Sequence, residues 1–162
     1  MASRSPAIGV KDQNLEQPPK RGPAHERLDA FVGNWKIDGR NAEGAPRAAN
    51  MRVSGDESYE WLPGRFFLLH RWDRRFGDTQ HTGIAVIGYD GSRDAYSAHF
   101  FDNLGYARTY DATIRDRVLT LMGARERASI SVSGGIMMTH WERTSDGAHW
   151  TPLCDLTGTK VT

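Results

Sequence analysis

The sequence has little of several residues on which common protein classes depend. It contains a single cysteine, Cys154, so it cannot form an intrachain disulfide, a CxxC redox pair or a thiolate zinc cage. Its 21 basic and 20 acidic side chains leave a net charge of +1, which provides no field to attract nucleic acid or an acidic membrane. We therefore expect no nucleic-acid partner, and the lone thiol fits a reducing compartment.

Long apolar runs are also missing. No run approaches the roughly 20 apolar residues of a membrane-spanning helix. The first 25 residues, MASRSPAIGVKDQNLEQPPKRGPAH, lack the continuous apolar segment of a secretory signal. These absences predict a soluble, cytoplasmic protein that does not associate with membranes.

Helical periodicity occurs in only one segment. Residues 1–23 hold four of the seven prolines and few large apolar side chains, which predicts a disordered N-terminal tail followed by one domain over 24–162. After Pro23, the side chains of Leu28, Phe31 and Val32 follow the i, i+3, i+4 spacing of a helix, and Gly33 fits its end.

From Trp35 onward, apolar residues alternate with polar ones in short segments separated by Asp, Asn and Gly. This pattern predicts strands near 34–40, 48–55, 57–62, 66–75, 82–89, 95–102, 106–114, 117–123, 127–133, 136–144 and 149–157. Because the connections are short, consecutive strands should pair antiparallel. Closure removes the exposed edges of such a meander, so we expect an all-β, closed up-and-down barrel with the short helix at one end. A barrel of about eight to ten strands can hold one small ligand.

Four phrases of the sequence resemble a known family. FVGNW, WLPGRFFLLHRWD, VIGYDGSRDAYSAHFFDNLG and SDGAHWTP are similar to a bacterial family of lipocalin-like (calycin) domains of unknown function, over residues 25–161. The resemblance implies a barrel closed at one end by the helix and open at the other. It also implies that Trp35 lies at the closed end under a basic side chain, either Lys160 or Arg143.

The Gly-x-Trp opening at Gly33 and Trp35 is shared more distantly with lipocalins and with haem-binding, nitrobindin-like barrels. The glycine pattern that follows differs from that of nitrobindins, since the next glycine is Gly39. We therefore expect no cofactor and keep haem as an alternative, with His140 or His149 as the iron ligand.

The strand expected at 66–75 carries the first candidate site. Alternation places Phe66, Leu68, His70 and Trp72 on one face, and the opposite face, which contains Arg71 and Asp73, must reach solvent. His70 therefore points inward. It is interpreted as a hydrogen-bonded core histidine, a pocket-lining residue or an acid–base group, and these three alternatives stay open.

Two further strands contribute candidates. In 95–102, Tyr96 and Asp102 lie opposite His99, and we expect His99 to point inward toward His70, with Tyr110 near the same rim. In 136–144, the face with Met137 and Trp141 is expected to line the lumen. The catalytic candidates are then His70, His99, Tyr96, Asp102 and Tyr110, and the ligand-binding candidates are Phe66, Leu68, His70, Trp72, His99, Met137 and Trp141.

The remaining histidines do not form a recognised metal motif. His25, His81 and His149 fall at expected helix or loop positions and are predicted to be solvent-exposed. His70, His99 and His140 could form a metal site only if all three faced inward, so no metal is expected.

Two functions remain open. The first is a barrel that binds a small, mostly apolar molecule, as a monomer or homodimer. The second is a cofactor-independent enzyme, a cyclase or isomerase, that acts by acid–base chemistry on a small hydrophobic substrate in the same lumen.

Overall fold

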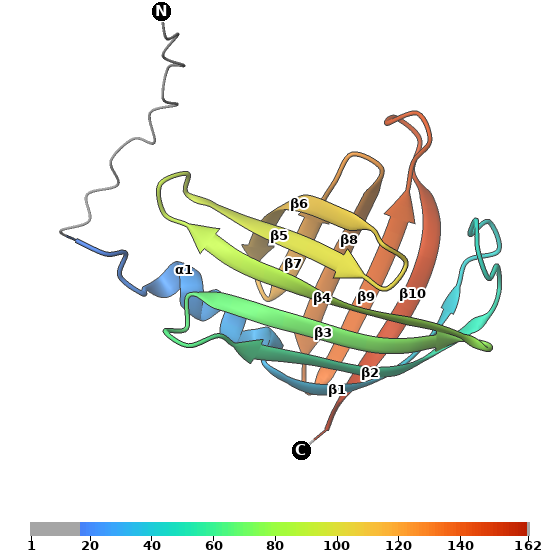
Figure 1. Ribbon diagram of the computed structural model, residues 1–162, viewed down its shortest axis with the longest axis horizontal. Coiled ribbons are helices and arrows are strands. Elements are labelled where there is room, and N and C mark those ends of the chain that lie inside the picture. The colour runs from blue at the N-terminus through green and yellow to red at the C-terminus, as the bar shows by residue number, and fades with distance from the viewer. Residues whose placement is uncertain (1–16, 162) are drawn as a thin grey trace, which may run out of the picture.

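Ten antiparallel strands form a closed barrel in the computed structural model, which describes residues 17–161 (Figure 1). The order along the chain is α1 (Pro23–Glu26), a 3-10 helix η1 (Arg27–Phe31), β1 (Gly33–Asn41), β2 (Arg52–Trp61), β3 (Phe67–Phe76), β4 (Thr79–Asp90), β5 (Ala95–Asp102), β6 (Ala107–Arg115), β7 (Val118–Met122), β8 (Glu126–Ser133), β9 (Ile136–Arg143) and β10 (Thr151–Val161). The predicted all-β up-and-down barrel with an N-terminal helix is confirmed. The predicted tail falls mostly on residues 1–16, which lie outside the described residues.

Every strand pairs with its neighbour in sequence, and β1 also pairs with β10 to close the barrel. Along each strand, buried and exposed residues alternate. In β6, for example, Tyr110, Ala112 and Ile114 are buried while the residues between them are exposed. The inward side chains of all ten strands therefore form one core, because successive side chains of a strand point to opposite faces.

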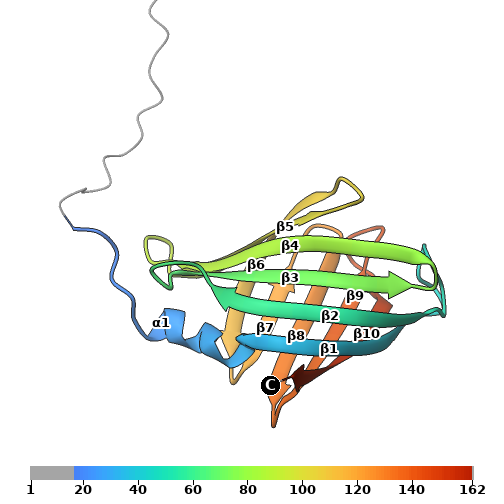
Figure 2. The ribbon, with the colours of Figure 1, turned by 60° about the horizontal axis from the view of Figure 1, so that its bottom comes forward.

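The two ends of the barrel differ. The helical segment lies at one end, and the β1–β2 loop lies at the other in both ribbon views (Figures 1 and 2). Leu28 and Phe31 of η1 are completely buried against the core, which closes the helical end. The apolar stripe predicted from the spacing of Leu28 and Phe31 is therefore the face of the helical segment that packs against the barrel core.

Trp35 occupies the closed end as the resemblance implied. Its side chain is 1% exposed, and the indole Nε1 donates a hydrogen bond of 3.0 Å to the carbonyl oxygen of Phe31. Of the two cations considered, Lys160 is the one that lies over the indole ring, with its Nζ 5.5 Å from the ring centre. Lys160 reaches this position because it pairs with Trp35 between β1 and β10.

The expected strands at 48–55 and 57–62 are a single strand, β2. The sequence Ser54-Gly55-Asp56 resembles a turn, and for this reason the prediction wrongly divided β2 into two strands. In the barrel, a Cβ atom on Gly55 would collide with the backbone carbonyl of Asp73 on β3. Gly55 therefore permits a close approach of two strands rather than a turn.

No helix in residues 17–161 has the length and apolar character needed to cross a membrane.

Candidate functional site

A cavity of about 680 Å³ opens at the end of the barrel opposite the helix. It is bordered by the β1–β2 loop, the β3–β4 turn and the β5–β6 hairpin, which lie at the right in Figure 1. Aromatic side chains from four strands and one loop form much of its wall. They are Trp72, Phe76, Phe100, Tyr106, Tyr110 and Trp141.

Ionisable side chains run along one side of this cavity, one from each of several strands; all but the buried Glu57 line the cavity itself. We call this set the charge belt. It consists of Glu57 on β2, Arg74 on β3, His81 on β4, Asp102 on β5, Arg108 on β6 and Glu126 on β8.

The buried end of the belt is a three-residue network. Glu57 pairs with Trp72 in the β2–β3 register, so its neighbours two residues away on β3 are His70 and Arg74. Glu57 Oε2 is 2.9 Å from His70 Nε2, and Glu57 Oε1 accepts a bond of 2.6 Å from Arg74 Nε. Tyr59 stacks on the His70 ring with centroids 4.0 Å apart and planes 6° apart.

The protonation states of this network follow from its surroundings. Burial alone would raise the pKa of Glu57, but the Arg74 guanidinium and the hydrogen bond from His70 outweigh it and lower the pKa to about 2. Burial lowers the pKa of His70, and Glu57 opposes this only in part. At neutral pH, a neutral His70 therefore donates its Nε2–H to the Glu57 carboxylate.

His81 and Asp102 form the next pair along the belt. His81 Nε2 lies 3.2 Å from Asp102 Oδ2. The other oxygen, Oδ1, accepts the backbone N–H groups of Leu104 and Tyr106 at 3.0 and 3.1 Å. Burial raises the pKa of Asp102, but these backbone hydrogen bonds and His81 lower it overall. Asp102 thus fixes both the β5–β6 hairpin and the orientation of the imidazole.

Arg108 completes the belt with looser contacts. Its Nη1 is 4.0 Å from Asp102 Oδ2 and 3.7 Å from Glu126 Oε2. The Tyr110 hydroxyl donates a bond of 2.9 Å to the same Glu126 oxygen. Burial raises the pKa of Tyr110, and the nearby carboxylate adds to the effect, so this phenol stays protonated and acts as a donor.

Two imidazole nitrogens and one indole nitrogen near the cavity are buried and have no hydrogen-bond partner among the described residues. These atoms are His70 Nδ1, His81 Nδ1 and Trp72 Nε1. His70 does not line the cavity, because the Trp72 and Phe100 rings lie against it with centroids at 5.1 and 6.3 Å. Although Trp72 and His81 line the cavity, their unpaired nitrogen atoms are also buried, so none of the three nitrogens is exposed at the cavity surface.

The structure distributes the predicted site residues among several places. Trp72, Trp141, Asp102 and Tyr110 line the cavity. Leu68 and Met137 are 0% and 1% exposed in the core and do not line it.

Phe66 and Tyr96 lie at the opposite, closed end. The Phe66 ring meets His25 edge-on at 5.2 Å, and the Tyr96 hydroxyl donates a bond of 2.6 Å to the carbonyl oxygen of Ala24. The expected cluster of Tyr96 with His70 near the rim does not form, because the inward residues of β5 are spread along the whole length of the barrel.

The prediction that His99 points inward is wrong. His99 is exposed on the outer surface, where its Nδ1 lies 3.4 Å from the Thr109 hydroxyl. Tyr96, Ala98 and Phe100 are the inward residues of β5 instead. His140 also lies outside, paired with Asp155, so three histidines cannot converge on a metal.

The prediction that His25 and His81 are solvent-exposed is also wrong. His25 is 6% exposed, and its Nδ1 accepts the backbone N–H of Gly22. His81 is in the cavity wall because β4 begins at Thr79, three residues before the expected strand. His149 is exposed as predicted.

Glu57, Arg74 and Arg108 are site residues that the sequence reasoning missed. Each occupies an inward position among alternating residues of its strand, and that parity was the available signal. Charged side chains are normally assigned to solvent, because burial of an unpaired charge is costly. Here each charge has a partner of opposite sign from a neighbouring strand.

The arrangement does not fit a haem ligand. His81 is the one histidine among the described residues that lines the cavity, and its Nε2 is bonded to Asp102. Its other nitrogen, Nδ1, is unpaired but buried, so no imidazole nitrogen of the described residues is both unpaired and open to the cavity. His140 and His149, the ligands considered for haem, do not line it.

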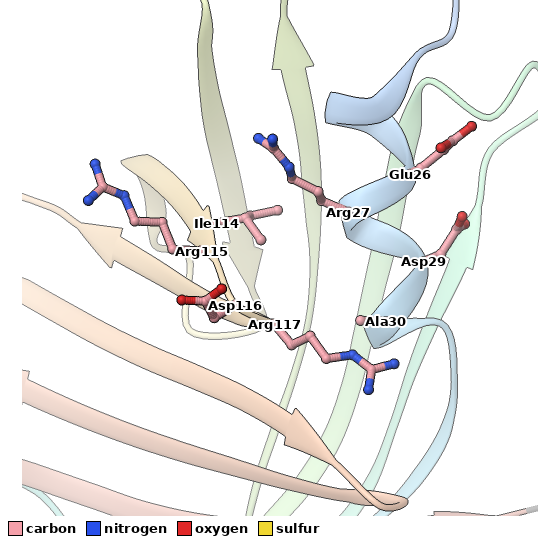
Figure 3. A pocket seen from close by; sticks show the side chains of 8 residues that line it. All are labelled: Glu26, Arg27, Asp29, Ala30, Ile114, Arg115, Asp116 and Arg117. Atoms are coloured by element: carbon pink, nitrogen blue, oxygen red, sulfur yellow. The ribbon is translucent and has the colours of Figure 1, made fainter.

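A second hollow of about 770 Å³ lies at the closed end, between η1 and the β6–β7 turn. Figure 3 shows Arg27 directed from the helical segment toward the side of Ile114 and Arg115, with Glu26 and Asp29 directed to the other side of the helical segment. Apart from Ala30 and Ile114, its lining side chains are charged. They are Glu26, Arg27, Asp29, Arg115, Asp116 and Arg117. This hollow lacks the aromatic wall of the cavity at the open end.

The family model described as "Protein of unknown function (DUF1579)" matches residues 20–134. The chain belongs to this family. The match covers most of the barrel and agrees with the lipocalin-like family that the sequence resembles. No curated protein matches this chain in sequence.

Solved structures of similar shape show the same fold. The crystal structure of Rv2717c from M. tuberculosis has a TM-score of 0.65 and 11% identity, with 88% of this DUF1579 chain and 100% of that chain covered. Zebrafish ileal bile acid-binding protein, complexed with cholic acid, has a TM-score of 0.52 and 14% identity, with 82% and 99% covered. At these identities, the likeness establishes the barrel fold alone.

Proposed function

We propose that this DUF1579 protein binds a small, mostly apolar molecule in the cavity at the open end of the barrel. The observation that carries the proposal is the cavity itself. It has a volume within the usual range of ligand sites, an aromatic wall and a few converging polar groups. Trp72 and Trp141 would contribute large contact surfaces to the bound molecule.

The fold supports this proposal by analogy. In zebrafish ileal bile acid-binding protein, a barrel of this fold is complexed with cholic acid. A barrel with an open cavity at one end is therefore an architecture in which a small molecule can be held. The analogy concerns the fold and does not identify the ligand of this chain.

The second candidate is a cofactor-independent acid–base enzyme, and the His81–Asp102 pair favours it. An imidazole held by a carboxylate through one nitrogen can use the other as a general base. In this structure, however, the other nitrogen, Nδ1, is buried. The His81 ring would have to rotate before Nδ1 could reach a substrate, so the geometry favours binding.

The binding proposal is tested with the uncharged fluorescent probe N-phenyl-1-naphthylamine. Titration of the protein should give a saturable rise and blue shift of probe fluorescence, as transfer to an apolar cavity requires. Trp141→Ala should weaken binding because it removes part of the cavity wall. Trp150→Ala is the matched control, since Trp150 does not line the cavity. A lack of saturable binding, or equal weakening by both substitutions, would refute the proposal.

The enzyme candidate is tested with ligands captured from host extract by native mass spectrometry. Each captured ligand is incubated with wild-type protein and with His81→Gln, and its mass and NMR spectrum are followed. Turnover by the wild type but not by the variant would establish catalysis. Unchanged ligand with both proteins would leave binding as the function.

A further inference from the structure

Two arginines meet at one tyrosine in the mouth of the cavity. Arg47, from the β1–β2 loop, has its Nη2 3.5 Å from the Tyr106 hydroxyl. Arg108, from β6, has its guanidinium carbon 4.3 Å from the centre of the Tyr106 ring. All three side chains line the cavity. We call this group the mouth cluster.

The guanidinium groups of the mouth cluster have hydrogen-bond donors to spare. An arginine carries five N–H donors and no acceptor. Within residues 17–161, the contact with Tyr106 is the one hydrogen bond of the Arg47 guanidinium, and Arg47 has no ion pair. The Arg108 guanidinium makes no hydrogen bond there and has only its two loose ion pairs, at 3.7 and 4.0 Å.

The neighbouring carboxylates, in contrast, are already engaged. Asp102 accepts two backbone N–H groups and His81, and its side chain is 6% exposed. Glu126 accepts the Tyr110 hydroxyl. The unused hydrogen-bonding capacity of the mouth cluster therefore consists mainly of donors on positively charged groups, and a ligand that complements it must supply acceptor oxygens.

We infer that the ligand is amphipathic, with a single carboxylate held by Arg47 and Arg108 and an apolar body lying against the aromatic wall. This inference rests on the proposed binding function and names the ligand class. A planar carboxylate matches the fork of guanidinium donors. The direction of binding follows, because the mouth cluster is at the rim and Phe100 and Trp141 form the apolar wall.

The charge balance favours a monoanion over a dianion. Glu126 and Asp102 already offset part of the Arg108 charge at 3.7 and 4.0 Å. The uncompensated charge of the mouth cluster is therefore close to that of Arg47 alone. A dianionic group such as a phosphate ester would also face repulsion from both carboxylates.

The test compares two probes that differ only in the head group, 1-pyrenebutyrate and 1-pyrenebutanol. Wild-type protein should bind the carboxylate about tenfold more tightly than the alcohol, as expected for hydrogen bonds to charged groups. The preference should fall as salt is raised, because the cluster is partly exposed to solvent. Fluorescence titration gives both dissociation constants.

Variants assign the preference to the mouth cluster. Arg47→Gln with Arg108→Gln should abolish the preference for pyrenebutyrate over pyrenebutanol, so that the two probes bind with equal affinity. Far-ultraviolet circular dichroism and saturable binding of pyrenebutanol show that the double variant is folded. The matched control is Arg71→Gln with Arg115→Gln, which removes two exposed arginines away from the cavity. This control should keep the tenfold preference.

The outcomes separate the two proposals. Equal affinity for both pyrene probes, or a preference that survives Arg47→Gln with Arg108→Gln, overturns the carboxylate inference while naphthylamine binding upholds the proposed function. If none of the three probes binds, the proposed function itself fails.

Discussion

The Glu57 carboxylate and the His70 imidazole form a completely internal pair. Their Oε2 and Nε2 atoms are 2.9 Å apart, and each side chain is 3% exposed. The Glu57 carboxylate also neutralises the charge of Arg74, whose side chain is 11% exposed and contacts the other Glu57 oxygen, Oε1. Glu57 is therefore the residue that makes a charged network tolerable inside the barrel.

Loss of Glu57 should destabilise the protein strongly. Glu57→Ala would leave the Arg74 guanidinium buried without a counter-charge, and the expected loss in the free energy of unfolding is about 3–5 kcal/mol. Urea denaturation followed by tryptophan fluorescence measures it. Glu60→Ala is the control, because the one ion pair of Glu60 within residues 17–161 is with the exposed Arg71, and its loss should cost less than about 1 kcal/mol. Equal losses for the two variants would contradict the assigned role of Glu57.

The stability of the barrel should decrease as the pH is lowered. Burial lowers the pKa of His70 in the folded state below its ordinary value of 6.5, so the unfolded chain binds a proton first. The stability from this group is complete above pH 6.5 and is lost as the pH falls below it. Glu57 acts in the same direction at lower pH, because its pKa falls from 4.5 to about 2 on folding and its contribution is lost across that range.

The measurement is the melting temperature between pH 8 and pH 4. Wild-type protein should melt at progressively lower temperature below pH 6.5. His70→Gln keeps a donor for Glu57 but does not titrate, so its melting temperature should change less between pH 7 and pH 5. His81, whose pKa burial also lowers, contributes to the slope that remains. An unchanged slope in His70→Gln would contradict the assignment.

The parity of β3 was sufficient to predict the direction of His70 and Trp72. Arg71 and Asp73 on the opposite face must reach water, so only one orientation of the strand is compatible with burial. The same reasoning failed for His99, because both faces of β5 carry aromatic residues. Phe100 points inward, and Phe101, at 49% exposure, points outward, so hydrophobicity did not distinguish the faces.

Parity marks the inward positions of the charge belt, but the contacts among its side chains could not be predicted, because they depend on the register between strands. Gly83 on β4 pairs with Asp102 on β5. His81, two residues before Gly83 on the same face of β4, therefore lies beside Asp102 and can contact its carboxylate. A one-residue change of register would turn a whole strand face away from the cavity. The sequence predicts the closed barrel from its short connections, but it does not specify the register that assembles these charges.

Gly83 should be essential for the position of Trp72 in the cavity wall. The indole ring lies against the Cα of Gly83, and a Cβ atom there would also come within 2.5 Å of the Phe101 carbonyl oxygen. Gly83→Ala should therefore displace Trp72, change its near-ultraviolet circular dichroism and weaken probe binding. Gly44→Ala is the control, because a Cβ at Gly44 meets no atom within 4 Å. Unaltered binding by Gly83→Ala would show that Trp72 does not need this contact.

Trp35 should contribute to stability without affecting the ligand. It lies at the closed end, 1% exposed, so Trp35→Ala would leave a large void and lose the hydrogen bond to Phe31. The expected loss is about 3–5 kcal/mol, with a sharp fall in melting temperature. Lys160→Met, which removes only the cation over the ring, should cost about 0.5–1 kcal/mol.

Well below the lowered melting temperature, Trp35→Ala should bind N-phenyl-1-naphthylamine with wild-type affinity, because the cavity is at the other end of the barrel. An unchanged melting curve would contradict the structural role of Trp35, and weakened probe binding by the folded variant would contradict the separation of the two ends.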